Sequence, residues 1–359
     1  MIKLIKPYIS FEEVETEFRE VFESGWFTRG RFVTSFAEEI ARYTGARHAF
    51  LATSATTALW LCLKLLEIGP GDEVVVSDFS FPATANVVED LGATPVFADV
   101  SPDTFNMLPA QLASKVSPRT KAVIFVDALG NPAGLHEIRS ICRERGIPLV
   151  EDAACAIGSS ERGVRCGAIA DLTCFSFHPR KLLTTGEGGA ITTGDAAWAE
   201  RLAVKLSHGS VIKDGKFDFV DYGYNFRLSE LQAVMGIKQL AKLDAIVASR
   251  NAIRAAYIEE LAGTGFIEQK GAPDVVHNVQ SLVFRVPRGV DRDALIVHLK
   301  GEGVEATLGT YCLSGTTYYQ KKYGAPQPNA WQLQQETLTL PCFEGVDVGA
   351  VCRALRSFL

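Results

Sequence analysis

The sequence predicts an α/β fold, with a mostly parallel central sheet, helices on both of its faces and a smaller C-terminal α+β domain. Three observations predict this fold. Apolar, β-branched runs alternate with helical patterns, a long helical pattern begins near Leu228, and the pattern changes after Gly263-Thr264-Gly265. We therefore place a large domain at residues 12–235 and a small domain at residues 236–359, and we expect residues 1–11 to pack with the small domain.

Strands are expected at residues 73–77, 94–98, 122–126 and 148–151, with helices at 57–67, 83–91, 108–116 and 135–145. Gly69-Pro70-Gly71-Asp72 precedes one strand, and Gly130-Asn131-Pro132 follows another. Apolar residues at helical spacing favour one continuous helix from residue 228 to about residue 261. Beyond it we expect a strand at 281–286, a helix at 292–300 and a terminal helix at 350–358.

Composition narrows the classes of function. The chain has 359 residues, 47% hydrophobic and 22% charged, which is enough for a large core. Its net charge of -6 and lack of a basic run argue against nucleic-acid or membrane-surface binding. Its apolar stretches are too short to span a bilayer, and the N-terminus lacks the apolar region of a signal peptide. The eight cysteines form no C-x-x-C pair, so we expect reduced thiols, a cytoplasmic location and no metal site.

A lysine and an aspartate form the most informative pair in the chain. Lys181 follows an apolar strand end and precedes the glycine-rich turn Gly186-Glu187-Gly188-Gly189, while Asp152 ends the strand Leu149-Val150-Glu151-Asp152. A lysine that binds pyridoxal 5'-phosphate (PLP) needs a carboxylate partner for the pyridinium nitrogen. Taken singly, Lys181 could be an exposed loop residue and Asp152 a turn-capping acid, but their joint spacing favours a PLP site.

A phosphate-binding segment is expected at the start of the helix near residue 57. Small and hydroxylated residues precede that helix, and free N–H groups at a helix start bind anions. Ala55 and Thr56 are the expected donors, and the Ser176 hydroxyl lies close enough to Lys181 in the chain to help. Without Lys181 and Asp152, an ordinary N-cap would be the preferred interpretation.

Two residues are candidates for the faces of the pyridine ring. Phe81 follows a predicted strand, in the kind of loop where open α/β sheets bind ligands, and an aromatic side chain there can stack on the ring. Ala154 is small enough to let the opposite face lie near the backbone. The alternative for Phe81 is a core position, since the chain has 21 phenylalanines.

These motifs resemble the DegT/DnrJ-type nucleotide-sugar aminotransferases, a branch of the fold-type-I PLP enzymes. The resemblance covers nearly the whole chain. Its motifs are Gly25-Trp26-Phe27-Thr28-Arg29-Gly30, Glu151-Asp152-Ala153-Ala154, the lysine segment that ends in Gly186-Glu187-Gly188-Gly189, and Gly223-Tyr224-Asn225-Phe226-Arg227-Leu228-Ser229-Glu230. The last two are specific when they occur together.

The resemblance implies a role for each candidate residue. Lys181 and Asp152 would be the catalytic pair, with Lys181 holding PLP and moving a proton between the amino carbon and cofactor C4′, and Asp152 facing the pyridinium nitrogen. Phe81 would stack on the ring and Ala154 would lie against its other face, with Ala55, Thr56 and Ser176 on the phosphate. Asn225 would reach the phosphate of a neighbouring subunit, which implies a homodimer with shared active sites. The implied substrates are a nucleotide-linked keto-sugar and L-glutamate.

Two departures from the family pattern affect the substrate. Cys155 stands where many members carry Gln or His, and the segment 309–314 lacks a histidine often found there. The turn containing Glu187 looks more like relatives that aminate C4, so a 4-keto-6-deoxy hexose is preferred. A 3-keto sugar and a keto-inositol stay open. Less favoured are a PLP-dependent sugar dehydratase, in which histidine commonly replaces the lysine, and a non-catalytic PLP-binding regulator.

Overall fold

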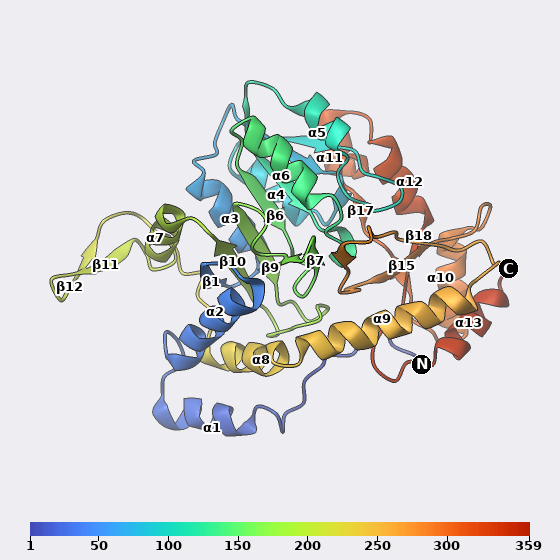
Figure 1. The fold of residues 1–359 in the computed structure, drawn as a ribbon, viewed down its shortest axis with the longest axis horizontal. Helices are drawn as coiled ribbons and strands as arrows, with labels where there is room; N and C mark the ends of the chain where they lie inside the picture. The colour runs from blue at the N-terminus through green and yellow to red at the C-terminus, as the bar shows by residue number, and fades with distance from the viewer.

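The computed structural model describes residues 1–359, and its central element is a seven-stranded sheet (Figure 1). The strand order is β1-β10-β9-β6-β5-β2-β4. Six strands run in one direction, and β10 alone runs antiparallel to its two neighbours, β1 and β9. The strands are β1 (His48–Ala52), β2 (Glu73–Ser77), β4 (Thr94–Ala98), β5 (Thr120–Val126), β6 (Leu149–Asp152), β9 (Leu172–Ser176) and β10 (Gly189–Thr193). The predicted mostly parallel sheet is confirmed.

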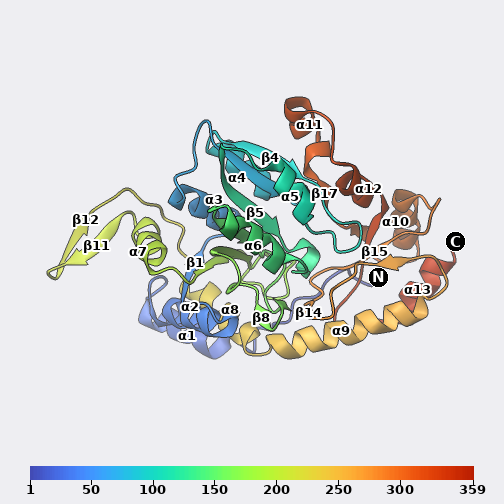
Figure 2. The same ribbon diagram turned by 45° about the horizontal axis from the view of Figure 1, so that its top comes forward.

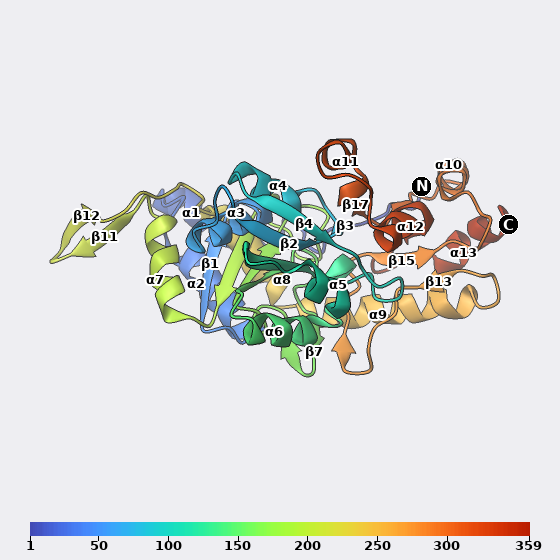
Figure 3. The same ribbon diagram turned by 90° about the horizontal axis from the view of Figure 1, so that it is seen from above.

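Helices cover both faces of this sheet, so each strand is buried on both sides. Val74 and Val76 of β2 face one core, whereas Val75 faces another, because successive side chains of a strand alternate. The first core includes α3 (Ala55–Leu65), α4 (Ala83–Asp90) and α7 (Ala196–Lys205), and the second includes α5 (Pro109–Lys115) and α6 (Leu135–Glu144). Figure 3 shows α4 and α6 on opposite sides of the sheet. The predicted two-sided arrangement is confirmed.

The single long helix expected from residue 228 to about residue 261 is wrong. The segment forms two helices, α8 (Glu230–Leu240) and α9 (Leu243–Glu260), with Lys242 outside helical geometry at φ -111°. The Lys242 amide donates to the Gln239 carbonyl, three residues back, and its ammonium lies 2.5 Å from Glu13. The break lets α8 pack on α2 (Arg31–Thr44) while α9 continues to the small domain (Figure 2).

The C-terminal part is built on an antiparallel sheet of order β13-β15-β18-β16. These strands are β13 (Ile267–Glu268), β15 (Leu282–Arg285), β18 (Thr337–Leu340) and β16 (Thr307–Leu308). Its core includes α10 (Arg292–Gly301), α13 (Val348–Arg356) and the end of α9. Ile2 bridges Val304, which brings the N-terminus to this sheet, but Tyr8 and Ile9 pack on a core of the large sheet. The division between residues 235 and 236 stays a prediction.

One hairpin stands apart from both sheets. Strands β11 (Ser210–Lys213) and β12 (Lys216–Phe219) pair antiparallel and project away from the rest of the chain (Figure 1). The other elements are α1 (Glu15–Ser24), α11 (Thr317–Tyr323), α12 (Pro328–Glu336), two short 3-10 turns, and the short strands β3 (Phe79–Ser80), β7 (Ser160–Glu161), β8 (Val164–Arg165), β14 (Val275–Val276) and β17 (Tyr311–Cys312). None of the helices has both the length and the apolar character that crossing a membrane requires.

Candidate active site

A cavity of about 550 Å³ lies at the carboxyl ends of the central strands. Its walls come from the start of α3, the ends of β6 and β9, the loop between β9 and β10, and segments around β16 and β17. Seven of the eight predicted site residues line it: Ala55, Thr56, Phe81, Asp152, Ala154, Ser176 and Lys181. Residues from distant parts of the chain therefore converge on one space.

Asp152 is buried at the last position of β6. Its carboxylate oxygens accept from the Thr84 hydroxyl at 2.7 Å and from the Ala154 amide at 3.3 Å. Burial raises the pKa of the Asp152 carboxyl above its ordinary value, while these two hydrogen bonds and the nearby Lys181 charge act in the opposite direction. The carboxylate is thus held in one orientation, and a cation beside it would favour its charged form.

The start of α3 offers free backbone donors. Ser54 caps the helix by accepting from the Thr57 amide at 3.1 Å, and the Thr57 hydroxyl accepts from the Ser54 amide at 3.1 Å. The amides of Ala55 and Thr56 take no part in this capping box and point out of the first turn. Gly189 of β10 lies so close that a Cβ atom there would come within 2.8 Å of the Ala55 nitrogen. The segment therefore combines an N-cap with backbone amides that could receive an anion.

Lys181 lies in the β9–β10 loop with its ammonium facing the cavity. Its Nζ donates to the Sγ of Cys155 at 3.0 Å, and its own amide donates to the His178 carbonyl at 2.9 Å. Cys155 also lines the cavity, so this residue, which the sequence reasoning left out of the binding set, belongs to the site. Burial lowers the pKa of His178 below its ordinary value, which favours a neutral ring beside the lysine.

Phe81 is not a core residue. Its side chain is 65% exposed and lines the cavity, with its ring centroid 6.4 Å from that of Tyr311. This position leaves a ring face free for a ligand. Ala154 and Ser176 line the same cavity.

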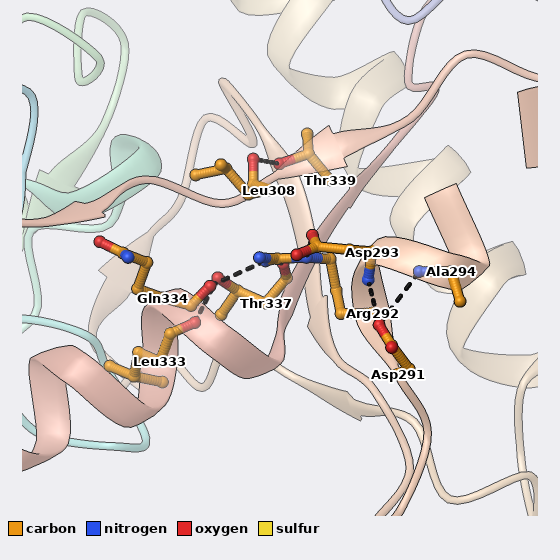
Figure 4. A network of polar contacts seen from close by, with 9 residues as sticks. All are labelled: Asp291, Arg292, Asp293, Ala294, Leu308, Leu333, Gln334, Thr337 and Thr339. Carbon is orange, nitrogen blue, oxygen red and sulfur yellow. Dashed lines mark hydrogen bonds and ion pairs between the residues drawn. The ribbon is translucent and has the colours of Figure 1, made fainter. Parts of the chain in front are cut away.

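The C-terminal part of the chain also lines the cavity, through residues 307–311 among others. Tyr311 pairs with Ser80 across β17 and β3, and Ser314 fixes this strand by donating to the buried Asp78 through its amide at 2.7 Å and its hydroxyl at 2.5 Å. Leu308 is held by the Thr339 hydroxyl at 2.9 Å, within the polar network of Figure 4. Arg292 in the same network donates to the carbonyls of Gln334 and Thr337, and so ties α10 to the end of α12 and the start of β18.

Asn225 is the one predicted site residue outside the cavity. It is exposed, in the segment that leads from the β11–β12 hairpin to α8. Its proposed contact with the phosphate of another subunit therefore stays a prediction.

Sequence reasoning does not identify several residues that support the site. Thr84, the donor to Asp152, lies three residues after Phe81, and that spacing could have indicated it. Two buried glutamines hold the lysine loop: Gln239 contacts the backbone of Thr184, and Gln280 contacts the backbone of Arg180 and Leu182. Both come from distant segments, so no local signal identifies them.

The residues at this site fit PLP in their chemistry. The free amides of Ala55 and Thr56 suit a phosphate, the exposed Phe81 suits an aromatic ring, and the buried Asp152 suits a ring cation. The amine of Lys181 faces the same cavity. Together the fold and this cavity define a PLP-dependent transferase.

The chain belongs to the DegT/DnrJ/EryC1/StrS aminotransferase family, whose profile matches residues 9–357. It is 35% identical over 377 residues to the spore coat polysaccharide biosynthesis protein SpsC of Bacillus subtilis, covering 98% of this chain and 96% of the relative. It is also 35% identical to the GDP-perosamine synthase of Caulobacter vibrioides, covering 80% of this chain and 78% of the relative. The aminotransferase TlmJ of Streptoalloteichus hindustanus has a similar structure, with a TM-score of 0.93, 33% identity and coverage of 99% and 98% of the two chains. The chain is therefore a PLP-dependent sugar aminotransferase.

Proposed function

We propose that this enzyme transfers an amino group from L-glutamate to a nucleotide-linked keto-sugar, a 4-keto-6-deoxy hexose that receives its nitrogen at C4. One observation carries the proposal: a lysine amine, a buried carboxylate, an exposed aromatic ring and free helix amides converge on one cavity. Residues 307–311 line the same cavity, where they could contact a larger substrate.

PLP, when bound, supplies an electron sink for the carbanion that forms when a proton leaves the amino carbon. The chain's residues would perform the remaining tasks. Asp152, fixed by Thr84, would keep the ring nitrogen protonated by charge proximity. Released Lys181 would act as the general base and acid, moving one proton between the amino carbon and cofactor C4′. The amides of Ala55 and Thr56 and the Ser176 hydroxyl would hold the phosphate.

The nature of the sugar has two lines of support. The relative GDP-perosamine synthase is named for a nucleotide-linked amino sugar, which supports a nucleotide-linked acceptor here. The choice of C4 rests on Glu187 in the turn after Lys181, because relatives that aminate C3 often carry Asp there. Glu187 lines the cavity. A 3-keto sugar or a keto-inositol is the alternative acceptor.

We also propose a homodimer with shared active sites, located in the cytoplasm. The projecting hairpin exposes Phe217 and Phe219, and Asn225 follows it in the chain. Exposed aromatic side chains on a projecting element suit a protein–protein contact. The eight cysteines form no disulfide, which suits a reducing compartment.

The function is tested by incubating the enzyme with PLP, L-glutamate and matched 3-keto and 4-keto nucleotide sugars, and locating the new amine by NMR. Amination at C4 that disappears in Lys181→Ala is expected, with unchanged circular dichroism in the variant. Amination only at C3 would overturn the choice of sugar. A fully active Lys181→Ala would overturn the role of the lysine.

Sharing of active sites is tested by complementation. Lys181→Ala and Asn225→Ala are each purified, then mixed under conditions that exchange subunits. If Asn225 serves the partner's site, a hybrid dimer has one intact site, and about a quarter of wild-type activity should return. Activity that stays at the average of the two variants would show that both residues serve the same subunit's site.

A further inference from the structure

A single side chain from outside the large sheet holds the peptide groups on both sides of Lys181. Gln280 lies just before β15, is 6% exposed, and donates from Nε2 to the Arg180 carbonyl at 2.7 Å. Its Oε1 accepts from the Leu182 amide at 2.8 Å. The side-chain amide thus bonds one backbone carbonyl and one backbone amide, as a neighbouring β-strand would, and Lys181 lies between these two groups.

The backbone at this point is strained. Val279, the residue before Gln280, is fully buried and has a φ of 55°. That conformation is unfavourable for a side chain branched at Cβ. Such strain persists only where the surroundings impose it, and it gathers at functional sites.

The surroundings that impose the strain are polar and buried. Arg250 donates to the carbonyl of Val279 at 2.7 Å and to that of Gln280 at 3.0 Å, and it also bonds the Cys342 carbonyl. From the other side, the Asn278 side chain accepts from the Gln280 amide at 2.8 Å. The turn is therefore held from both ends.

The same turn also fixes the partner of the lysine. Asn278 Nδ2 donates to the Cys155 carbonyl at 2.8 Å and to the Ile157 carbonyl at 2.8 Å. Cys155 is the residue whose sulfur lies 3.0 Å from Lys181 Nζ. One strained turn of three residues thus bonds the backbone on both sides of Lys181 and the backbone of Cys155, its contact partner.

We propose that Asn278, Val279 and Gln280 form a clamp that positions Lys181 for proton transfer, with Gln280 as its main positioning residue. The proposal rests on the role proposed above for Lys181. The clamp comes from the segment leading into β15, whereas Lys181 lies in the loop between β9 and β10 of the large sheet, so a distant segment of the chain places the lysine.

A general role in holding the loop together is the competing explanation, and the chain offers a matched control for it. Gln239 of α8 accepts from the Thr184 amide at 3.1 Å and donates to the Thr184 carbonyl at 2.6 Å. It is buried, and it bonds the backbone of the same loop three residues beyond the lysine. Gln239 and Gln280 therefore make equivalent bonds, but only Gln280 flanks Lys181.

The experiment compares Gln280→Met with Gln239→Met, because methionine keeps the length of the side chain and removes both hydrogen bonds. The first readout is a pH titration of the visible absorbance of the enzyme-bound cofactor. In Gln280→Met the midpoint should rise by about one pH unit, a tenfold change in the ratio of protonation states. Lys181 is then no longer held by Gln280, so the bound cofactor and lysine can relax into the arrangement that holds the titrating proton more tightly. In Gln239→Met the midpoint should equal that of wild type.

The second readout separates kcat from KM. Gln280→Met should lower kcat about 100-fold, as misplacement of a reacting group does, with little change in the KM for glutamate. Unfolding midpoints of the unloaded proteins check that both variants fold. An unchanged titration in Gln280→Met, or an equal shift in Gln239→Met, would overturn the clamp.

Failure of the clamp and failure of the proposed function are distinguished by Lys181→Ala. If that variant loses the visible absorbance and Gln280→Met titrates like wild type, only the clamp is wrong. If Lys181→Ala keeps the absorbance, the lysine does not hold the cofactor, and both proposals are wrong.

Discussion

Opposing influences act on the pKa of the Asp152 carboxyl at the end of β6. Burial raises the pKa of its carboxyl, whereas the Thr84 hydroxyl, the Ala154 amide and the charge of Lys181 lower it. In the unloaded protein, deprotonation of this carboxyl at neutral pH therefore costs stability. If Asp152 serves the proposed role, a cation on the ring nitrogen would offset that cost, as expected of a residue placed for function.

Asp152→Asn should lower activity by about 100-fold or more, the scale on which a preorganised charge partner acts. The unloaded variant should nevertheless be more stable than unloaded wild type at pH 8. Because the pKa of Asp152 is raised in the folded state, wild-type stability falls as pH rises above the unfolded-state pKa of about 4. Asparagine has no such proton to lose, so the variant avoids this loss of stability. Thermal unfolding across this pH range checks it. Parallel curves for the two proteins would contradict the expectation.

Thr84 gives a finer test of the same carboxylate. Thr84→Val removes the 2.7 Å hydrogen bond to Asp152 with little change in shape. Bonds to charged groups contribute about 1.5–3 kcal/mol, so we expect PLP to bind about tenfold more weakly or worse. Ser80→Ala is the control, since the Ser80 hydroxyl contacts Thr84 at 2.8 Å but not Asp152. Equal PLP affinities in both variants, measured by fluorescence titration, would contradict this role.

Two adjacent strands bring a pair of buried acids together. Asp127 follows β5 and Glu151 lies in β6, and neither oxygen of Asp127 nor the Oε1 of Glu151 receives a hydrogen bond. Glu151 accepts from the Thr173 hydroxyl at 2.7 Å through its other oxygen. Burial, followed by the charge of Glu151, raises the pKa of Asp127 well above its ordinary value. The raised pKa favours the protonated form of Asp127, whose proton can then serve the neighbouring Glu151.

Asp127→Asn tests this pairing through stability. In wild type, the raised pKa of Asp127 means that stability decreases as pH rises from about 4 through the folded-state value. An asparagine amide donates to Glu151 at every pH, so the variant should lose stability less steeply. Asp103→Asn is the control, an acid paired with Lys270 at the surface. Denaturant unfolding at several pH values measures the slopes, and an unchanged slope in Asp127→Asn would refute the shared proton.

At the scale of elements, local patterns predicted what depends on neighbours in sequence. The strands at residues 73–77 and 94–98 have the expected bounds, and the helix expected at 57–67 begins two residues earlier because Ser54 caps it. The break at Lys242 was missed because the apolar spacing continues through it, and the break is set by packing of α8 on α2. Local motifs predicted seven of the residues that line the cavity, whereas the position of Gln280 depends on a tertiary contact that no local pattern contains.

The whole molecule has one conspicuous unpartnered element, the β11–β12 hairpin. Phe217 and Phe219 are 70% and 68% exposed on it. If they bind a second subunit, replacing both with aspartate removes anchors of the interface, and each such residue can contribute about 2 kcal/mol or more. The dimer should dissociate, and activity should fall because Asn225 no longer reaches its site.

Analytical ultracentrifugation with parallel activity assays measures this. Val297→Asp is the control, since Val297 is 71% exposed on α10, away from the hairpin. A Phe217→Asp/Phe219→Asp protein that stays dimeric and active would contradict the assignment of this interface.

The unequal accessibility of the cysteine thiols has a practical consequence. Seven of the eight cysteines are buried, whereas Cys155 is partly accessible and lines the cavity beside Lys181. A small alkylating reagent such as iodoacetamide should therefore modify one thiol of the folded protein first, and bound PLP should shield that thiol. The rate of labelling, followed by mass spectrometry, would report how much of the enzyme carries its cofactor without any assay of turnover.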